Sequence, residues 1–184
     1  MEIITTRISG CYEIRPTVVR DERGTFVKTF HQDLFAGYGL ATAFAEEYYS
    51  VSRFRVLRGL HFQVPPREHV KVVYCVKGRV LDAVVDLRRG SPTYGQYAAI
   101  EITGDAANMV YMTCGLAHGF YVLSEEAIVV YKVTSIHSPE HDTGIHWNSA
   151  GIPWPDRQPI VSLRDSGLVH FAEFQSPFRY ESSQ

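Results

Sequence analysis

The chain has 184 residues, of which 45% are hydrophobic and 21% are charged, and its formal net charge is −2. This balance predicts one ordinary globular domain over residues 1–184 and argues against nucleic acid or an anionic membrane surface as a partner. Because the chain has no long apolar run, no secretory signal pattern and only three widely spaced cysteines, we expect a cytoplasmic protein without disulfides.

Most of the chain has strand character, in short runs that are rich in β-branched residues and separated by turn signals. One exception is the short amphipathic segment 32–37, which predicts a helix that glycines terminate. The runs that predict strands are 70–76, 79–87, 95–102, 108–112 and 127–133. The pair Lys77-Gly78 between the first two is short enough for a hairpin. Many short strands favour an antiparallel sandwich or barrel, so we expect an all-β jelly-roll β-barrel with short peripheral helices and the site inside.

The run 57–63 carries the first candidate chemistry, because it places Arg58, Gly59 and His61 at the end of an apolar segment. Lys71 follows ten residues after His61 and opens the next strand-like run. A histidine and a cation that face one pocket can remove a proton next to a carbonyl. The imidazole accepts the proton and the cation stabilises the resulting oxyanion.

Three histidines lie in suggestive contexts, although most histidines are hydrogen-bonded rim or core residues. We accept this structural interpretation for His69, while flanking glycines favour a functional role for His61 and His118. A metal site is disfavoured because a strand would need two inward histidines one residue apart, and the sequence contains no His-x-His. We therefore expect no metal and no cofactor.

Several other residues allow two interpretations each. Tyr131 is either a core aromatic of its strand or a proton donor on the side of the pocket opposite the histidine. Asp165 is either a solvated loop carboxylate or the partner that orients an imidazole. Arg23 lies in a polar turn and either stays solvated or contacts a phosphate.

Taken together, these segments resemble one family, the dTDP-4-dehydrorhamnose 3,5-epimerases, which are cupin-type enzymes. The resemblance runs from about residue 14 to about residue 165, and its motifs keep the order of the family. These motifs are Asp21-Glu22-Arg23-Gly24-x-Phe26, Val56-Leu57-Arg58-Gly59-Leu60-His61-Phe62-Gln63, Lys71, Asp82-x-x-x-Asp86-Leu87-Arg88, Ser91-Pro92-Thr93-Tyr94, Ala117-His118-Gly119-Phe120, Tyr131-Lys132, Gly144-Ile145-x-Trp147-Asn148, Trp154-Pro155 and Arg164-Asp165.

The resemblance implies metal-free acid–base chemistry on a nucleotide-linked 4-keto-6-deoxyhexose. His61 matches the base that removes the protons at C3 and C5, and Asp165 matches its carboxylate partner. Lys71 matches the cation that stabilises the enolate, and Tyr131 matches the acid on the opposite face. The positions that match substrate contacts are Arg23, Phe26, Arg58, Gln63 and His118.

Two segments depart from the pattern of the family. Thr134-Ser135-Ile136-His137 stands where the family often has Thr-Asp-Tyr-Tyr, so an aromatic residue near the nucleotide is either missing or replaced by His137. Glu46-Glu47-Tyr48-Tyr49 stands where Gln-Asp-Asn-His is common. Thymidine is the default nucleoside, and cytidine and guanosine remain open.

The main functional hypothesis is a 3,5-epimerase. The alternatives are an epimerase that inverts one centre, a non-catalytic sugar-nucleotide-binding barrel and a metal-dependent cupin. The resemblance also implies a homodimer in which an arginine such as Arg23 crosses to the neighbouring subunit.

Overall fold

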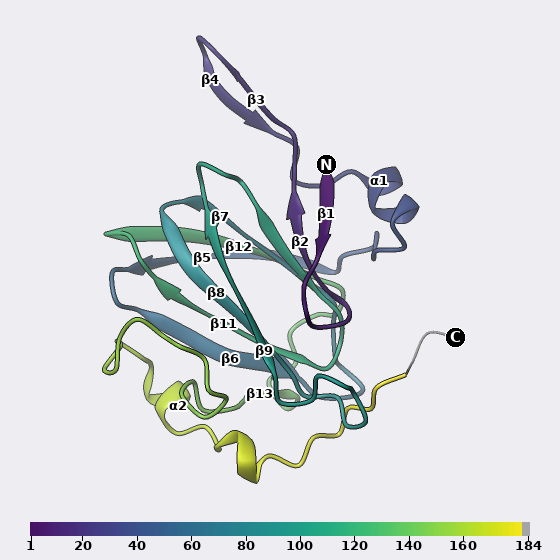
Figure 1. Ribbon diagram of the computed structural model, residues 1–184, viewed down its shortest axis with the longest axis vertical. Coiled ribbons are helices and arrows are strands. Elements are labelled where there is room, and N and C mark those ends of the chain that lie inside the picture. The colour runs from purple at the N-terminus through teal and green to yellow at the C-terminus, as the bar shows by residue number, and fades with distance from the viewer. Residues whose placement is uncertain (182–184) are drawn as a thin grey trace.

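The computed structural model describes residues 1–181, which form two antiparallel β-sheets that face each other (Figure 1). The first sheet has six strands in the order β1-β2-β10-β7-β12-β5. Their bounds are Glu2–Thr5, Cys11–Arg15, Met109–Met112, Lys71–Lys77, Glu126–Val133 and Glu46–Arg53.

The second sheet has five strands in the order β13-β6-β11-β8-β9. Their bounds are Asp142–Gly144, Leu57–Gln63, Leu116–Val122, Arg79–Asp86 and Tyr97–Thr103. Consecutive strands alternate between the two sheets over much of the chain, as in a jelly roll, so the predicted jelly-roll fold is confirmed.

Three short helical elements lie outside the two sheets. The helix α1 spans Gln32–Gly37, as the sequence predicted. The helix α2 spans Leu163–Ser166 and is followed by a 3₁₀ helix at Phe171–Glu173. Within the described residues, no helix is long and apolar enough to cross a membrane.

The hairpin of β3 (Val18–Asp21) and β4 (Gly24–Val27) projects away from both sheets (Figure 1). Its strands pair only with each other. The side chain of Phe26 on this hairpin is 65% exposed. A large aromatic side chain held this far from the core gains little from burial within its own chain.

The predicted hairpin at Lys77-Gly78 is wrong, because the chain passes from one sheet to the other at this point. The strand β7 pairs on both sides with β10 and β12, and β8 pairs on both sides with β11 and β9. Neither strand therefore has a free edge for the other. Gly78 has a φ of +82°, which permits the sharp bend between the sheets.

The main hydrophobic core fills one end of the space between the sheets. Val73, Cys75 and Val129 contribute from the six-stranded sheet, and Val84 and Phe120 contribute from the five-stranded sheet. All five side chains are buried. The other end of the same space carries polar side chains, and it is there that the candidate site lies.

Candidate active site

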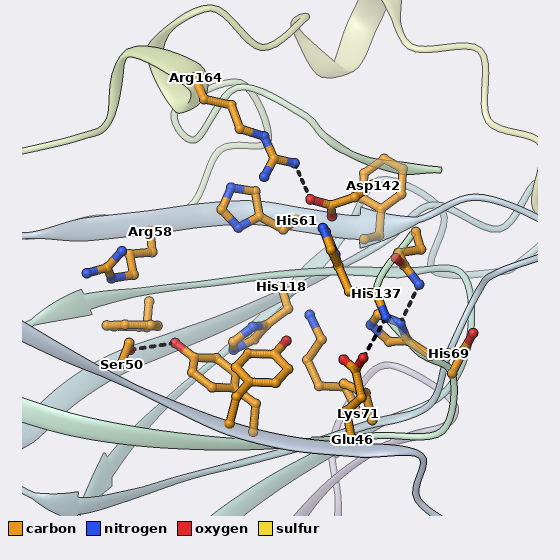
Figure 2. Close-up of a pocket in the computed structure, with 17 residues that line it drawn as sticks. Glu46, Ser50, Arg58, His61, His69, Lys71, His118, His137, Asp142 and Arg164 are labelled. Atoms are coloured by element: carbon orange, nitrogen blue, oxygen red, sulfur yellow. Dashed lines mark hydrogen bonds and ion pairs between the residues drawn. The ribbon is translucent and has the colours of Figure 1, made fainter. Parts of the chain in front are cut away.

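A pocket of about 520 Å³ opens between the two sheets. The six-stranded sheet and the loop after β12 contribute one wall, and the five-stranded sheet with the segment around α2 contributes the other (Figure 2). The residues that line it are Glu46, Tyr48, Ser50, Arg58, His61, Phe62, Gln63, His69, Lys71, His118, Phe120, Tyr131, Val133, Ser135, His137, Asp142 and Arg164.

Strand alternation explains why this wall is polar at one end and apolar at the other. Inward positions of a strand recur every second residue, and on β7 they are Lys71, Val73 and Cys75. The last two belong to the hydrophobic core, and Lys71 lines the pocket. On β5 the inward residues Glu46, Tyr48 and Ser50 follow the same period. The barrel therefore has an apolar end and a polar end built from the same strands.

A β-bulge in β6 brings Arg58 and His61 into the same pocket. In the pairing of β6 with β11, His118 lies opposite His61 and Phe120 lies opposite Arg58. Three residue steps on β6 thus match two on β11, which inserts one extra residue. Strict alternation would have placed Arg58 and His61 on opposite faces.

Gly59 lies inside this bulge, and only a glycine fits there. Its φ is +130°, and a Cβ atom built on it would lie 2.5 Å from the Cα atom of Gly119 on β11. A Cβ atom at Gly119 would in turn lie 2.6 Å from the carbonyl oxygen of Arg58. The two glycines let β6 and β11 approach closely enough for His61 and His118 to lie side by side.

Asp165 holds the ring of His61 in place. Its Nε2 atom lies 2.7 Å from Oδ1 of Asp165, while Oδ2 of that carboxylate accepts a hydrogen bond from the Gly59 N–H at 3.2 Å. Asp165 is buried on α2, whose N-cap is Ser162. Burial alone would raise the pKa of Asp165, but the hydrogen bonds from His61 and Gly59 outweigh it and lower that pKa.

This hydrogen bond fixes the tautomer of His61. A carboxylate can only accept hydrogen bonds, so Nε2 of His61 carries the ring proton and Nδ1 keeps its lone pair. The side chain of His61 is 28% exposed and lines the pocket. His61 therefore presents a partly accessible basic nitrogen with an anion behind the ring.

His118 forms a second histidine–carboxylate pair. His118 lies inside β11, and its Nε2 atom is 2.7 Å from Oδ2 of Asp82 on β8. Both side chains are buried. Burial lowers the pKa of His118 despite the attraction of Asp82, and the charge of Lys71 lowers it further. His118 is therefore a neutral imidazole in the pocket wall.

Lys71 is buried at the pocket end of β7. Burial lowers its pKa to about 8, against the opposing attraction of Asp142 and Asp82. The ammonium group points into the cavity between His118 and Glu46 in Figure 2. Because little solvent reaches this buried ammonium group, it is well suited to stabilise a negative charge that develops on a ligand.

Tyr131 lies on β12 in the six-stranded sheet, opposite the wall that carries His61. Its hydroxyl lies 3.0 Å from Oγ of Ser50 on β5. Burial raises the pKa of Tyr131, so the phenol is protonated at neutral pH. The base and the phenol thus lie on facing sheets, with the pocket between them.

The two segments that depart from the family pattern meet at one end of the pocket. Oε1 of Glu46 accepts a hydrogen bond from the backbone N–H of His137 at 3.1 Å. Both residues line the pocket, and so does His69. Burial and the charge of Lys71 lower the pKa of His69 to about 3, so His69 is a neutral imidazole in the pocket wall.

Gln63 joins the same end of the pocket. Its amide nitrogen donates to the backbone oxygen of Arg67 at 2.7 Å and lies 3.3 Å from Nδ1 of His69. Its amide oxygen accepts from the Ser138 N–H at 2.6 Å. Gln63 therefore ties β6 to the loop after β12 as well as lining the cavity.

Arg23 and Phe26 lie on the β3–β4 hairpin, away from the pocket that this chain lines. Arg23 pairs with Asp21 of the same hairpin, and its side chain is 85% exposed. Neither residue reaches the pocket of its own chain. A contact with the substrate would require a second copy of the chain.

The structure brings Arg58, His61, Gln63, Lys71, His118, Tyr131 and His137 into one pocket, with Asp165 behind His61. No role followed from the sequence for Asp82, for Tyr48 or for the ion pair of Asp142 with Arg164, whose atoms are 2.8 Å apart. The period-two alternation of Glu46, Tyr48 and Ser50 was the signal available for Tyr48. Asp82 and Arg164 stand in motifs of the family pattern, but their partners depend on how the chain folds.

Chemically, the site combines a basic imidazole, a buried ammonium group and a protonated phenol around a cavity that can hold a sugar. These are the groups needed to remove and return a proton next to a carbonyl. Within residues 1–181, no group of three or more histidine, cysteine, aspartate or glutamate side chains is arranged to hold a metal ion.

Comparison with known proteins identifies relatives that cover nearly the whole chain. The chain is similar to the dTDP-4-dehydrorhamnose 3,5-epimerase of Shigella flexneri, with 38% identity over 94% of this chain and 97% of that protein. It is also similar to the dTDP-4-dehydrorhamnose 3-epimerase of Streptomyces niveus, with 38% identity over 90% of this chain and 82% of that protein.

Among solved structures, the chain is similar to the dTDP-6-deoxy-D-glucose-3,5-epimerase of Legionella pneumophila in complex with dTDP-4-keto-L-rhamnose. The TM-score is 0.94 at 34% identity, over 98% of this chain and 99% of that chain. The model of the family described as dTDP-4-dehydrorhamnose 3,5-epimerase matches residues 5–173. The chain therefore belongs to the dTDP-4-dehydrorhamnose 3,5-epimerase family.

Proposed function

We propose that this protein inverts C3 and C5 of a dTDP-linked 4-keto-6-deoxyhexose. The observation that carries the proposal is the placement of His61 with Asp165 on one wall of the pocket and of Tyr131 and Lys71 on the other. Inversion of a carbon requires a base on one face and an acid on the opposite face. A sugar ring that lies between the two sheets meets both.

In the first step, Nδ1 of His61 removes the proton from a carbon next to the 4-keto group. The electron pair of the C–H bond becomes the enolate, whose oxygen takes the negative charge. Asp165 stabilises the imidazolium that forms, and the ammonium group of Lys71 stabilises the enolate oxygen. Both charges are thus compensated while the proton is away.

In the second step, Tyr131 gives its hydroxyl proton to the same carbon from the opposite face, and the centre is inverted. The resulting phenolate regains a proton from solvent, and the His61 imidazolium returns its proton to solvent. The enzyme is therefore restored, and no cofactor takes part. Ser50, which lies within hydrogen-bond distance of the Tyr131 hydroxyl, stabilises the phenolate.

The remaining pocket residues bind the substrate. Arg58 supplies a positive charge near the catalytic centre for the diphosphate. His118 offers a neutral nitrogen, because its other nitrogen is held by Asp82. His137 lies at the end of the cavity that we assign to the nucleoside, and Gln63 hydrogen-bonds to the residues on either side of it, Ile136 and Ser138.

We further propose that the protein is a homodimer in which Arg23 and Phe26 of one subunit complete the pocket of the other. The projecting hairpin leaves Phe26 65% exposed and Val19 51% exposed. A second copy is the partner that would bury these side chains. Light scattering should report twice the chain mass, and Phe26→Ser should shift the protein toward the monomer and raise KM. A monomeric wild-type protein would contradict this.

A single-centre epimerase is the second candidate function. The observation in its favour is that the 3-epimerase of Streptomyces niveus and the 3,5-epimerase of Shigella flexneri are equally similar to this chain, at 38% identity. Overall similarity therefore does not separate the two activities.

Incubation with dTDP-4-keto-6-deoxyglucose in deuterated water tests both candidates. We expect NMR spectroscopy to show deuterium at C3 and C5 and formation of the doubly inverted sugar. Exchange at one carbon alone would favour the single-centre enzyme. If neither carbon exchanges, the same experiment is repeated with CDP- and GDP-linked 4-keto-6-deoxy sugars. No exchange with these sugars would favour a binding protein.

A further inference from the structure

Tyr48 is a second tyrosine on the pocket wall that carries Tyr131. The two residues lie directly opposite each other in the pairing of β5 with β12. Their rings are stacked, with centroids 4.9 Å apart and an angle of 18° between the planes. Both line the pocket. The wall that faces His61 thus carries two parallel phenols rather than one.

The two hydroxyl groups differ in their surroundings. The hydroxyl of Tyr131 lies 3.0 Å from Ser50 Oγ, and its side chain is buried. The hydroxyl of Tyr48 forms no hydrogen bond with any other residue in 1–181, and Tyr48 is 45% exposed. Partial burial and the charges of Asp142 and Glu46 raise the pKa of Tyr48 to about 12. Tyr48 is therefore a protonated phenol that solvent can reach.

The proposed reaction, on which this inference rests, needs protons at two positions. C3 and C5 lie on either side of the keto carbon, and each must be protonated on the face opposite the base. One phenol held by Ser50 at a fixed position does not lie equally close to both carbons. Two stacked phenols offer two positions along the same face of the sugar.

We propose that Tyr48 is a catalytic proton donor for one of the two carbons, and that Tyr131 serves the other. At its carbon, the O–H bond of Tyr48 breaks and a C–H bond forms with the electron pair of the enolate. The Tyr48 phenolate then takes a proton from water, to which it is exposed. His61 gives the proton it removed back to solvent, so each inversion leaves the enzyme unchanged.

A purely structural role for Tyr48 predicts something different. If the ring serves only to stack against Tyr131, loss of the hydroxyl should have no effect, because phenylalanine stacks equally well. The variant Tyr48→Phe therefore separates the two roles without removing the aromatic contact. Tyr49→Phe is the matched control, because Tyr49 is the next residue of β5, points to the opposite face and is 69% exposed.

The experiment follows C3 and C5 separately by NMR spectroscopy in deuterated water, with wild type, Tyr48→Phe, Tyr131→Phe and Tyr49→Phe. We expect Tyr48→Phe to exchange both protons but to invert one carbon only, with retention at the other. Tyr131→Phe should lose inversion at the complementary carbon. Tyr49→Phe should behave like wild type.

Other outcomes would contradict either the role of Tyr48 or the proposed function. Double inversion by Tyr48→Phe at the wild-type rate, equal slowing at both carbons, or loss of exchange at both carbons would each overturn the assignment of Tyr48 and leave the proposed function standing. Wild-type protein that exchanges neither carbon of any nucleotide-linked 4-keto sugar would overturn the proposed function, and this inference with it.

Discussion

Two histidine–carboxylate pairs lie on the same wall of the pocket, and their comparison shows what distinguishes a base from a binding group. In both pairs a histidine Nε2 atom lies 2.7 Å from a carboxylate oxygen, and His61 and His118 are neighbours across β6 and β11. The side chain of His61 is 28% exposed, whereas that of His118 is only 4% exposed.

The two carboxylates differ as well. Asp165 receives a second hydrogen bond from the Gly59 N–H, whereas Oδ1 of Asp82 is buried without a partner within residues 1–181. Burial lowers the pKa of His118. The distance within a pair therefore does not identify a base. A base is identified by its access to the ligand and by a well-stabilised carboxylate behind it, and both features favour His61.

The largest expected effect comes from removing the two imidazoles in turn. His61→Ala should lower kcat by about 10⁴-fold, because no other group in the pocket has its access and its carboxylate. Deuterium should also stop entering the sugar. His118→Ala should keep exchange, with a higher KM. If His61→Ala exchanges deuterium at the wild-type rate in the NMR assay, His61 is not the base.

The next largest loss of activity is expected when the carboxylate behind His61 is replaced. Asp165→Asn should lower kcat by about 10³-fold, because an amide no longer requires the proton to stay on Nε2 of His61. The fold should persist, because asparagine has the same shape and still accepts the Gly59 N–H. Steady-state kinetics with circular dichroism checks both statements, and an unchanged kcat would contradict the assigned role.

Lys71 lies on the opposite wall of the pocket, and its replacement should give a smaller loss. Lys71→Met should lower kcat by about 10²–10³-fold, because the enolate loses its cation. In the wild type, activity should fall as pH rises through about 8, where the buried amine loses its proton. A pH–rate profile that stays flat to pH 10 would show that the charge of Lys71 is not required.

The same buried charge affects stability with a definite sign. The pKa of Lys71 is near 8 in the folded protein and near 10.5 in the unfolded chain, so the unfolded chain binds the proton more tightly. The free energy of unfolding therefore rises as the pH increases from about 8 to about 10.5. Lys71→Met should stabilise the fold at pH 7 by up to about 3 kcal/mol. Urea unfolding at pH 7 and pH 10 should show that this gain shrinks at the higher pH.

Asp82→Ala should give the smallest effect on activity and sharpen the contrast with Asp165. It leaves the buried Nε2 of His118 without a partner, which should cost about 1–3 kcal/mol in the free energy of unfolding. Activity should fall by less than about tenfold, through KM. A loss in kcat as large as that of Asp165→Asn would make His118 a second base.

Five strands and the family could be predicted from the sequence because both signals are local. Runs of β-branched residues indicated β7, β8, β9, β10 and β12, and the motifs around His61 and Tyr131 indicated the family, which the comparisons confirm. The pairing of strands was not predictable in the same way. The bend at Gly78 looked like a hairpin, because two adjacent strands without a helix between them usually pair.

The candidate site was also only partly predictable, because it too depends on how the strands pair. The resemblance paired His61 with Asp165, and the structure brings the two together across 104 positions of sequence. Asp82 and Tyr48 were assigned no role, because their importance comes from what lies opposite them on a neighbouring strand. Arg58 and His61 share a face only because of the β-bulge, and no alternation pattern in the sequence predicts an extra residue.

The contact between Gly59 and Gly119 has a consequence for how this protein can evolve. At Gly59 a side chain would meet main-chain atoms of β11, and at Gly119 it would meet the carbonyl oxygen of Arg58 as well as the Leu60 side chain. A second substitution elsewhere cannot move these main-chain atoms out of the way. A library of all single substitutions should therefore find both positions intolerant even of alanine. Descendants of this chain can change their substrate through the residues around the cavity, while this crossing of two strands stays invariant.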